Sequence, residues 1–172
     1  AVRKSLAEHL QSNPDVPHDV ARKLATDVIE VAEPVLTHSD VLTDVDLIDI
    51  IRTQPTAAQV AVAKRRTVPE PVSDALAATG VELVVATLVR NNGAEISERT
   101  FERVINDFGQ SETVTSGMVS RQKLPPGVTR RLIDVVSDSL KMELIRKHDV
   151  PEDVAEKIVL KSQEDTLKDL LG

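Results

Sequence analysis

Arginines are the side chains in this sequence best suited to bind another molecule. Six of them lie in the middle of the chain, between two net acidic ends: Arg65, Arg66, Arg99, Arg103, Arg130 and Arg131. A guanidinium binds carboxylates and phosphates through paired hydrogen bonds. These six therefore predict a basic strip for an acidic peptide, a phosphorylated partner or a nucleotide. The simpler interpretation is a solvated face with local ion pairs, in which arginines at helix ends complement the helix dipole.

The remaining polar residues do not form a recognisable catalytic or metal-binding motif. The four histidines lack metal-ligand spacing, and the acidic stretch from Asp40 to Asp49 lacks the glycine and the closing glutamate of a calcium loop. We interpret Asp44 and Asp46 as first-turn acids of a helix, and His38 and His148 as residues near helix ends. No glycine-rich phosphate loop is present. We predict no catalytic residue, no metal and no cofactor.

Composition narrows the classes of protein further. The chain of 172 residues has no Cys, Trp or Tyr, two Phe and a formal net charge of −7. Disulfides and thiol chemistry are excluded, and the negative charge argues against a general nucleic-acid or membrane-surface binder. No apolar run approaches the roughly 20 residues that span a bilayer, and no secretory signal is recognisable. We expect a cytoplasmic protein, and the start at Ala1 suggests an excised domain.

One short phrase recurs along the chain and predicts where helices begin. An aliphatic residue is followed by Pro or a hydroxyl residue at Val16-Pro17, Leu42-Thr43, Val68-Pro69, Ile96-Ser97, Leu124-Pro125 and Val150-Pro151, at intervals of 26 or 28 residues. Pro is tolerated in a first helical turn, and Thr or Ser can cap the same free N–H groups. Aliphatic residues follow four and eight positions after the first residue of most phrases, as one helical stripe.

A second set of helical segments lies between the phrases, so the repeating unit is a pair of antiparallel helices. The predicted units are residues 1–26, 27–52, 53–79, 80–107, 108–136 and 137–162. A single pair cannot bury both of its faces, and neighbouring pairs must therefore stack. The sequence predicts an all-α protein, an α-solenoid of about six short HEAT-like helix pairs over residues 1–162. Residues 163–172 are predicted to extend or cap the final helix.

Several segments in order resemble a bacterial family, the domain of unknown function 2336 family. The resemblance rests on residues 27–39, 42–44, 46–47, 63–66, 72–76, 88–91, 124–126 and 136–138, and it covers most of residues 16–140. It includes the motif Ala63-Lys64-Arg65-Arg66. The resemblance implies a helical repeat fold and implies no activity.

These observations predict a non-enzymatic scaffold or adaptor that binds a protein or peptide on its surface, because extended repeat surfaces bind partners in this way. We expect the partner to be acidic or phosphorylated, and we do not expect nucleic acid or a membrane. Two alternatives stay open: nucleotide or nucleic-acid binding by the central arginines, and a HEAT-like enzyme with an unrecognised pocket. An open end of the stack could also support a homodimer.

Overall fold

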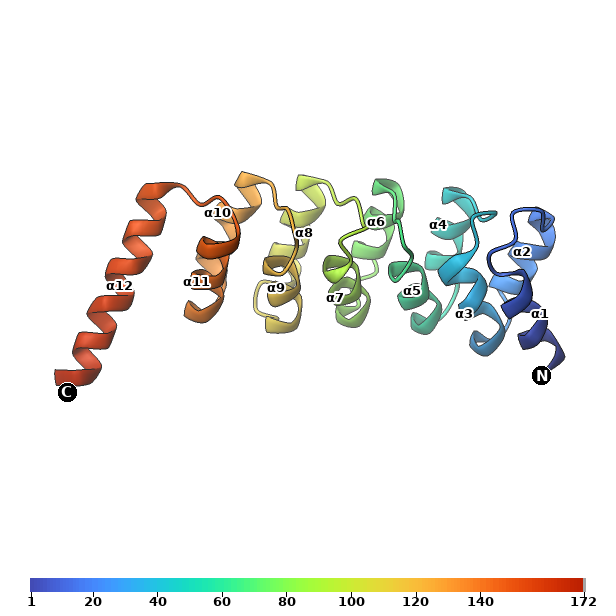
Figure 1. Cartoon of the computed structure of the whole chain (residues 1–172), viewed down its shortest axis with the longest axis horizontal. Helices are drawn as coiled ribbons and strands as arrows, with labels where there is room; N and C mark the ends of the chain where they lie inside the picture. The colour runs from blue at the N-terminus through green and yellow to red at the C-terminus, as the bar shows by residue number, and fades with distance from the viewer. Residues whose placement is uncertain (172) are drawn as a thin grey trace.

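The computed structural model describes residues 1–171, and these residues form helices and no strand. The helices, labelled in Figure 1, are α1 (Val2–Leu10), α2 (His18–Ala25), α3 (Ile29–His38), α4 (Asp44–Thr53), α5 (Thr56–Ala63), α6 (Glu70–Ala77), α7 (Glu82–Arg90), α8 (Glu98–Phe108), α9 (Glu112–Val119), α10 (Pro126–Val135), α11 (Asp138–Lys147) and α12 (Glu152–Leu171). The predicted all-α class is confirmed. Helix α12 runs through most of the predicted C-terminal extension, whose last residue, Gly172, lies outside the described residues.

Each recurring phrase starts an even-numbered helix, as the sequence predicts. The helices α2, α6 and α10 begin directly after Pro17, Pro69 and Pro125. These prolines occupy the N-cap position, one residue before the first turn in which we expected them. Their fixed φ near −60° suits the extended cap residue equally well. Thr43 and Ser97 cap α4 and α8 through their hydroxyl oxygens, which accept bonds from backbone N–H groups at 3.2 and 3.1 Å.

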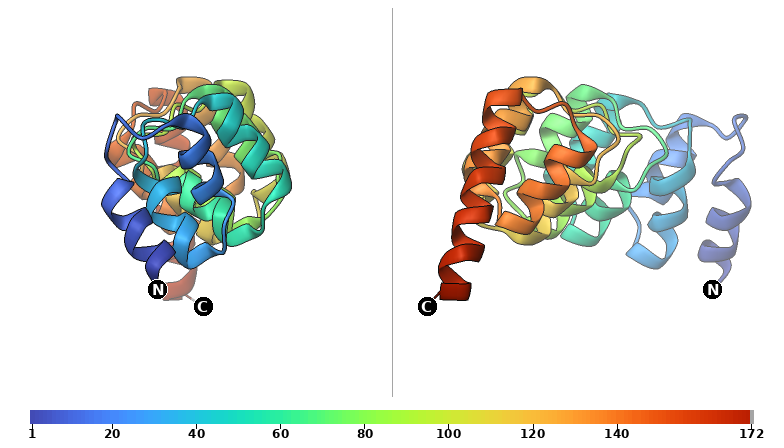
Figure 2. Two further views of the ribbon diagram at one scale, coloured as in Figure 1. Left: turned by 90° about the vertical axis from the view of Figure 1, so that its right-hand side faces the viewer. Right: turned by 60° about the vertical axis from the view of Figure 1, so that its left-hand side comes forward.

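The helices form two rows along an elongated stack whose termini lie at opposite ends (Figure 1). The odd-numbered helices pack on one another in chain order from α1 to α11, and α4, α6, α8 and α10 do the same beside them. The end-on view in Figure 2 shows the two rows as two sides of the stack. Within a pair, the antiparallel helices are joined by a link of several residues, and we call the two sets the odd row and the even row.

The core is an aliphatic layer between the rows. The predicted stripe positions Val72, Leu76, Val128 and Leu132 have no exposed surface, and Leu24 is also buried. Burying each leucine side chain contributes about 2 kcal/mol. Regular layers of this kind need few aromatic rings, and Phe101 alone has its ring fully within the core.

A series of side chains ties the links together, and we call it the carbonyl ladder: Arg65, Asn91, Arg121 and His148. Each follows an odd-row helix and bonds backbone carbonyl groups at the end of the preceding odd-row helix. Arg65 donates to the carbonyls of Leu36 and Ser39 at the end of α3, both at 2.6 Å. Arg121 donates to three carbonyls at and after the end of α7 at 2.9 to 3.1 Å. The last carbonyls of a helix lack partners within it, so the ladder satisfies them.

Candidate binding groove on the odd row

The six arginines predicted to bind a partner do not form one strip. Arg65 is 9% exposed and its guanidinium is engaged in the carbonyl ladder, whereas the adjacent Arg66 is exposed. Arg99 and Arg103 project from α8, and Arg130 and Arg131 project from α10, all of them in the even row and all exposed. Arg131 donates to the Asn106 side chain of α8 at 2.8 Å. Of the six, Arg65 is therefore not free to bind a partner, Arg66 lies in the link after α5, and the other four lie on α8 and α10.

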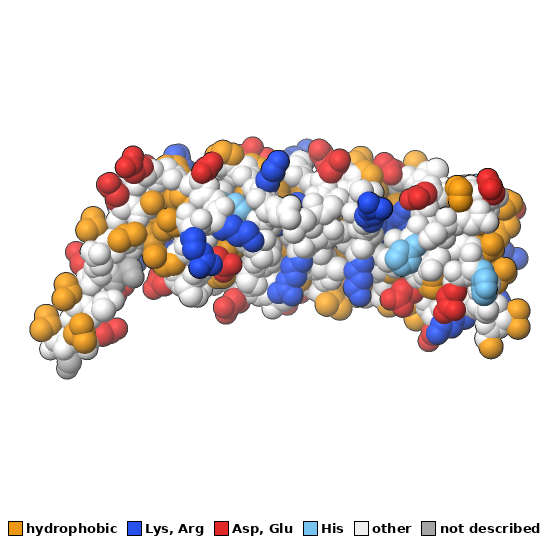
Figure 3. Space-filling model, in the orientation of Figure 1, with side chains coloured by type: hydrophobic (Ala, Val, Ile, Leu, Met, Phe, Trp, Pro, Cys, Tyr) orange, Lys and Arg blue, Asp and Glu red, His pale blue; other side chains and the backbone are white. Residues whose placement is uncertain are grey.

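A groove on the odd row gathers two other cations. It lies between the end of α5, the length of α7 and the start of α9, and its volume is about 370 Å³. We call it the cationic groove, and it is lined by Lys64, Leu83, Ala86, Thr87, Arg90, Asn91 and Thr113. Figure 3 shows basic side chains over the middle of this face, with uncharged surface between them.

The two cations of the groove are not needed as partners for the carbonyl groups at the helix ends. Lys64 follows α5 and Arg90 ends α7, so both lie where helix carbonyls would attract a cation. Asn91 already bonds the carbonyls of Ala63 and Arg65, and Arg121 bonds those of Val89 and Asn91 at the end of α7. Among residues 1–171, neither Lys64 nor Arg90 has a carboxylate within ion-pair distance. Their charges are available to a partner.

Arg90 is held in place across α9. Its guanidinium donates to the carbonyl of Thr113 at 3.2 Å, and its side chain crosses Gly117. A Cβ at position 117 would lie 2.9 Å from Cγ of Arg90 and 3.3 Å from its Nε. The missing side chain of Gly117 therefore leaves room for Arg90. Leu83, 60% exposed, adds an apolar wall to the same groove.

Sequence reasoning did not select Lys64 and Arg90 as the site. The signal was present, because the two residues are 26 positions apart and lie at the ends of consecutive odd-row helices. A cation at that place has an ordinary structural role beside helix carbonyls. Only the contacts of the carbonyl ladder show that this role is already filled.

Comparison with known proteins places the chain in one family. The family model described as an uncharacterised protein conserved in bacteria, domain of unknown function 2336, matches residues 31–172. The chain belongs to this family. No curated protein and no solved structure matches it. Every residue of the cationic groove lies within the part that matches domain of unknown function 2336.

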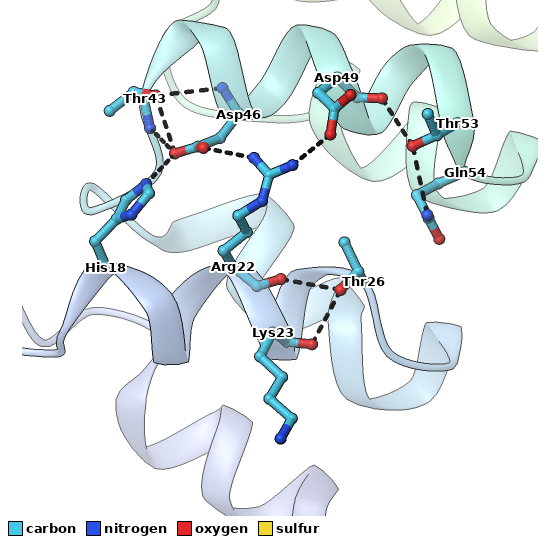
Figure 4. Close-up of polar contacts among 9 residues, drawn as sticks. All are labelled: His18, Arg22, Lys23, Thr26, Thr43, Asp46, Asp49, Thr53 and Gln54. Carbon is cyan, nitrogen blue, oxygen red and sulfur yellow. Dashed lines mark hydrogen bonds and ion pairs between the residues drawn. The ribbon is translucent and has the colours of Figure 1, made fainter.

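A second polar site of this protein centres on Asp46, whose side chain joins α4 to α2 (Figure 4). The carboxylate accepts bonds from the amide and hydroxyl of Thr43, both at 2.9 Å, which completes a capping box. It also accepts from Nε2 of His18 at 2.5 Å and from Arg22 at 2.7 Å. Arg22 bonds Asp49 as well. The predicted capping role is confirmed, and the sequence missed the contacts to the preceding helix pair.

Burial of the Asp46 carboxyl group raises its pKa, but the bonds from Thr43, His18 and Arg22 lower it more, and the pKa lies below its ordinary value. A carboxylate with a lowered folded-state pKa stabilises the fold above its unfolded pKa, about 3.9, and loses that contribution as the pH falls. The D46N variant should therefore lose about 2 kcal/mol of unfolding free energy at pH 7. Its deficit relative to the wild type should be smaller at pH 3.

Urea unfolding of both proteins at the two pH values measures this difference. The matched control is D49N, because the side chain of Asp49 is about half exposed and its carboxylate bonds only Arg22. Its ion pair should contribute less than about 1 kcal/mol. An equal deficit for D46N at pH 7 and pH 3 would show that the charge of Asp46 is not what stabilises the contact.

In the part of the chain that the structure describes, no group of three or more His, Cys, Asp or Glu side chains is placed to hold a metal ion. None of the helices over residues 1–171 is both long and apolar enough to cross a bilayer.

Proposed function

We propose that this protein is a HEAT-like α-solenoid that serves as a non-enzymatic cytoplasmic scaffold by binding an acidic protein segment in its cationic groove. Helix pairs repeated every 26 to 28 residues, each packed on its neighbours in chain order, support the solenoid assignment. The units are shorter than those usual in HEAT repeats. Such stacks offer a long surface on which a partner segment can lie.

One observation carries the choice of partner. Lys64 and Arg90 face the same groove without a carboxylate partner among the described residues, beside the exposed Leu83. A segment with a carboxylate next to an apolar side chain complements such a groove in both charge and shape. The chain as a whole carries −7, so this groove is a local basic site on an acidic protein. An acidic partner would be repelled by the net acidic ends of the chain and attracted to its basic surfaces, of which this groove is one.

Charge reversal in the groove tests the proposal. The double variant K64E/R90E should capture the bound partner from a bacterial lysate at least about tenfold less well than the wild type, because two attractions become repulsions. The matched control is R99E/R103E, which makes the same charge change on α8, outside the groove. Quantitative mass spectrometry of the captured proteins measures the effect, and circular dichroism checks that both variants remain folded.

The same experiment separates the rival functions. Equal losses by both double variants would indicate that net charge, and not the groove, governs capture. Capture that disappears after nuclease treatment would support nucleic-acid binding in place of a protein partner. If the wild type captures no protein that K64E/R90E fails to capture, the proposed scaffold function is wrong. Homodimerisation stays a prediction. It is supported by the apolar surface that α12 exposes through Leu160, Leu167, Leu170 and Leu171.

A further inference from the structure

We infer that the cationic groove recognises a phosphorylated side chain of its partner in preference to a carboxylate. The inference rests on the proposed function, because it specifies the chemistry of the segment that the groove binds. It makes the binding conditional on phosphorylation of the partner. The residues that carry it are Lys64, Arg90 and Thr113.

The first argument is charge. Two cations from consecutive helix pairs line one groove, and no carboxylate is among its lining residues. A phosphomonoester carries about −1.5 to −2 at pH 7 and offers three acceptor oxygens, whereas a carboxylate carries −1 and offers two. Two cations are balanced by one phosphomonoester. A single carboxylate would leave about one positive charge without a partner.

The second argument is the set of hydrogen-bond donors. One N–H group of Arg90 bonds the Thr113 carbonyl, which fixes the guanidinium and leaves other donors free. The Lys64 ammonium adds donors as a point charge. Thr113 lines the groove, and its hydroxyl has no hydrogen bond to another described residue. Asn91 adds none, because its amide group bonds the carbonyls of Ala63 and Arg65 at 2.9 and 2.7 Å.

A neighbouring groove also contains arginines, but its charged side chains suit a phosphate less well. It lies near the ends of α3 and α5, and Arg65 and Arg66 are among its lining residues. Asp40 also lines it, and the guanidinium of Arg65 is engaged with two carbonyls. A phosphate there would meet a carboxylate and only one free guanidinium. The cationic groove is the one of the two that suits a doubly charged anion.

The test is a titration of the full chain, followed by NMR spectra of backbone amides at Lys64, Thr87, Arg90 and Thr113. The probes are N-acetyl-O-phosphoserine methylamide, N-acetylglutamate methylamide and inorganic phosphate, at the same ionic strength and pH 7.5. We expect the phosphoserine probe to bind at least about fivefold more tightly than the glutamate probe. R90K keeps the charge but loses the planar fork, and should reduce this preference. R103K on α8 is the matched control and should leave it unchanged.

The outcomes are distinguishable from those of the capture experiment. If the glutamate probe binds as tightly as the phosphoserine probe, the inference is wrong while the scaffold proposal stands. If inorganic phosphate binds as tightly as phosphoserine, the groove binds free phosphate and the assignment to a partner side chain fails. Shifts that fall outside the groove residues, or no shifts at 10 mM probe (about the upper limit for such weak ligands), also overturn it. Loss of capture by K64E/R90E tests the scaffold separately.

Discussion

Replacing Arg121 with leucine should lower the free energy of unfolding by about 4 kcal/mol, the largest effect that we expect from a single side chain. Arg121 is 8% exposed and donates to the carbonyls of Val89, Asn91 and Ala94. Leucine would leave the carbonyls of Val89 and Ala94 without a partner in the protein, whereas the carbonyl of Asn91 keeps the bond from the N–H of Ala94. Each unsatisfied buried acceptor costs about 1 to 3 kcal/mol. The guanidinium also lies 5.5 Å from the ring centroid of Phe101, and that attraction would disappear too.

In R121L, the structure around position 121 should open more readily than the rest of the protein. Helix α7 packs on α5, α6 and α9, so opening of the α7–α9 contact need not disturb α1 to α4. Hydrogen exchange of R121L should accelerate first at the end of α7 and in the following link. Urea unfolding measures the overall loss.

The matched control for this variant is K123L, in the same link. Lys123 is exposed and outside the ladder, so the substitution should change stability by less than about 0.5 kcal/mol. R121K is intermediate, because one ammonium group cannot reproduce the fork that reaches three carbonyls. A stability of R121L within 1 kcal/mol of the wild type (about the size of one ordinary hydrogen bond) would contradict the structural role of the ladder.

Arg65 and Arg66 show where prediction from the sequence ends. They are adjacent and of the same type, yet Arg65 is buried in the ladder and Arg66 is exposed. The carbonyls that bind Arg65 belong to Leu36 and Ser39, 29 and 26 positions earlier. Nothing in the local sequence indicates that these carbonyls lie beside one arginine and not the other. The contact depends on how consecutive helix pairs stack, which no window of a few residues records.

The helix starts could be predicted because their causes are local. Pro17 fixes its own φ, and Thr43 caps the N–H group of Asp46, three residues ahead. The apolar stripe is equally local, since Val72 and Leu76 share one face of one helix. The cationic groove depends on three helices at once, and its cations matter only because Asn91 and Arg121 satisfy the carbonyls. The parts of the site were visible in the sequence, but their freedom to bind was not.

Substitution of Gly93 by alanine should destabilise the protein by about 3 kcal/mol, through a contact that the sequence does not reveal. A Cβ at position 93 would lie 1.9 Å from the carbonyl oxygen of Arg66, in the link of the preceding pair. The two links cannot separate easily, because the N–H of Val68 donates to the carbonyl of Gly93 at 3.1 Å and that of Glu95 donates to the carbonyl of Val68 at 2.8 Å. The clash is with backbone, which has no rotamer to change.

Gly80 provides the matched control, because it isolates the conformational effect of a glycine from the effect of contact. Its φ is +67°, and a Cβ there would meet no atom within 4 Å. G80A should lose about 1 kcal/mol, the usual strain of a left-handed residue with a side chain. Urea unfolding of G93A and G80A measures both. If G93A is no less stable than G80A, the links are looser than their hydrogen bonds indicate. The nearby walls of the cationic groove at Lys64 and Asn91 would then be adjustable, and recognition would rest on charge more than on shape.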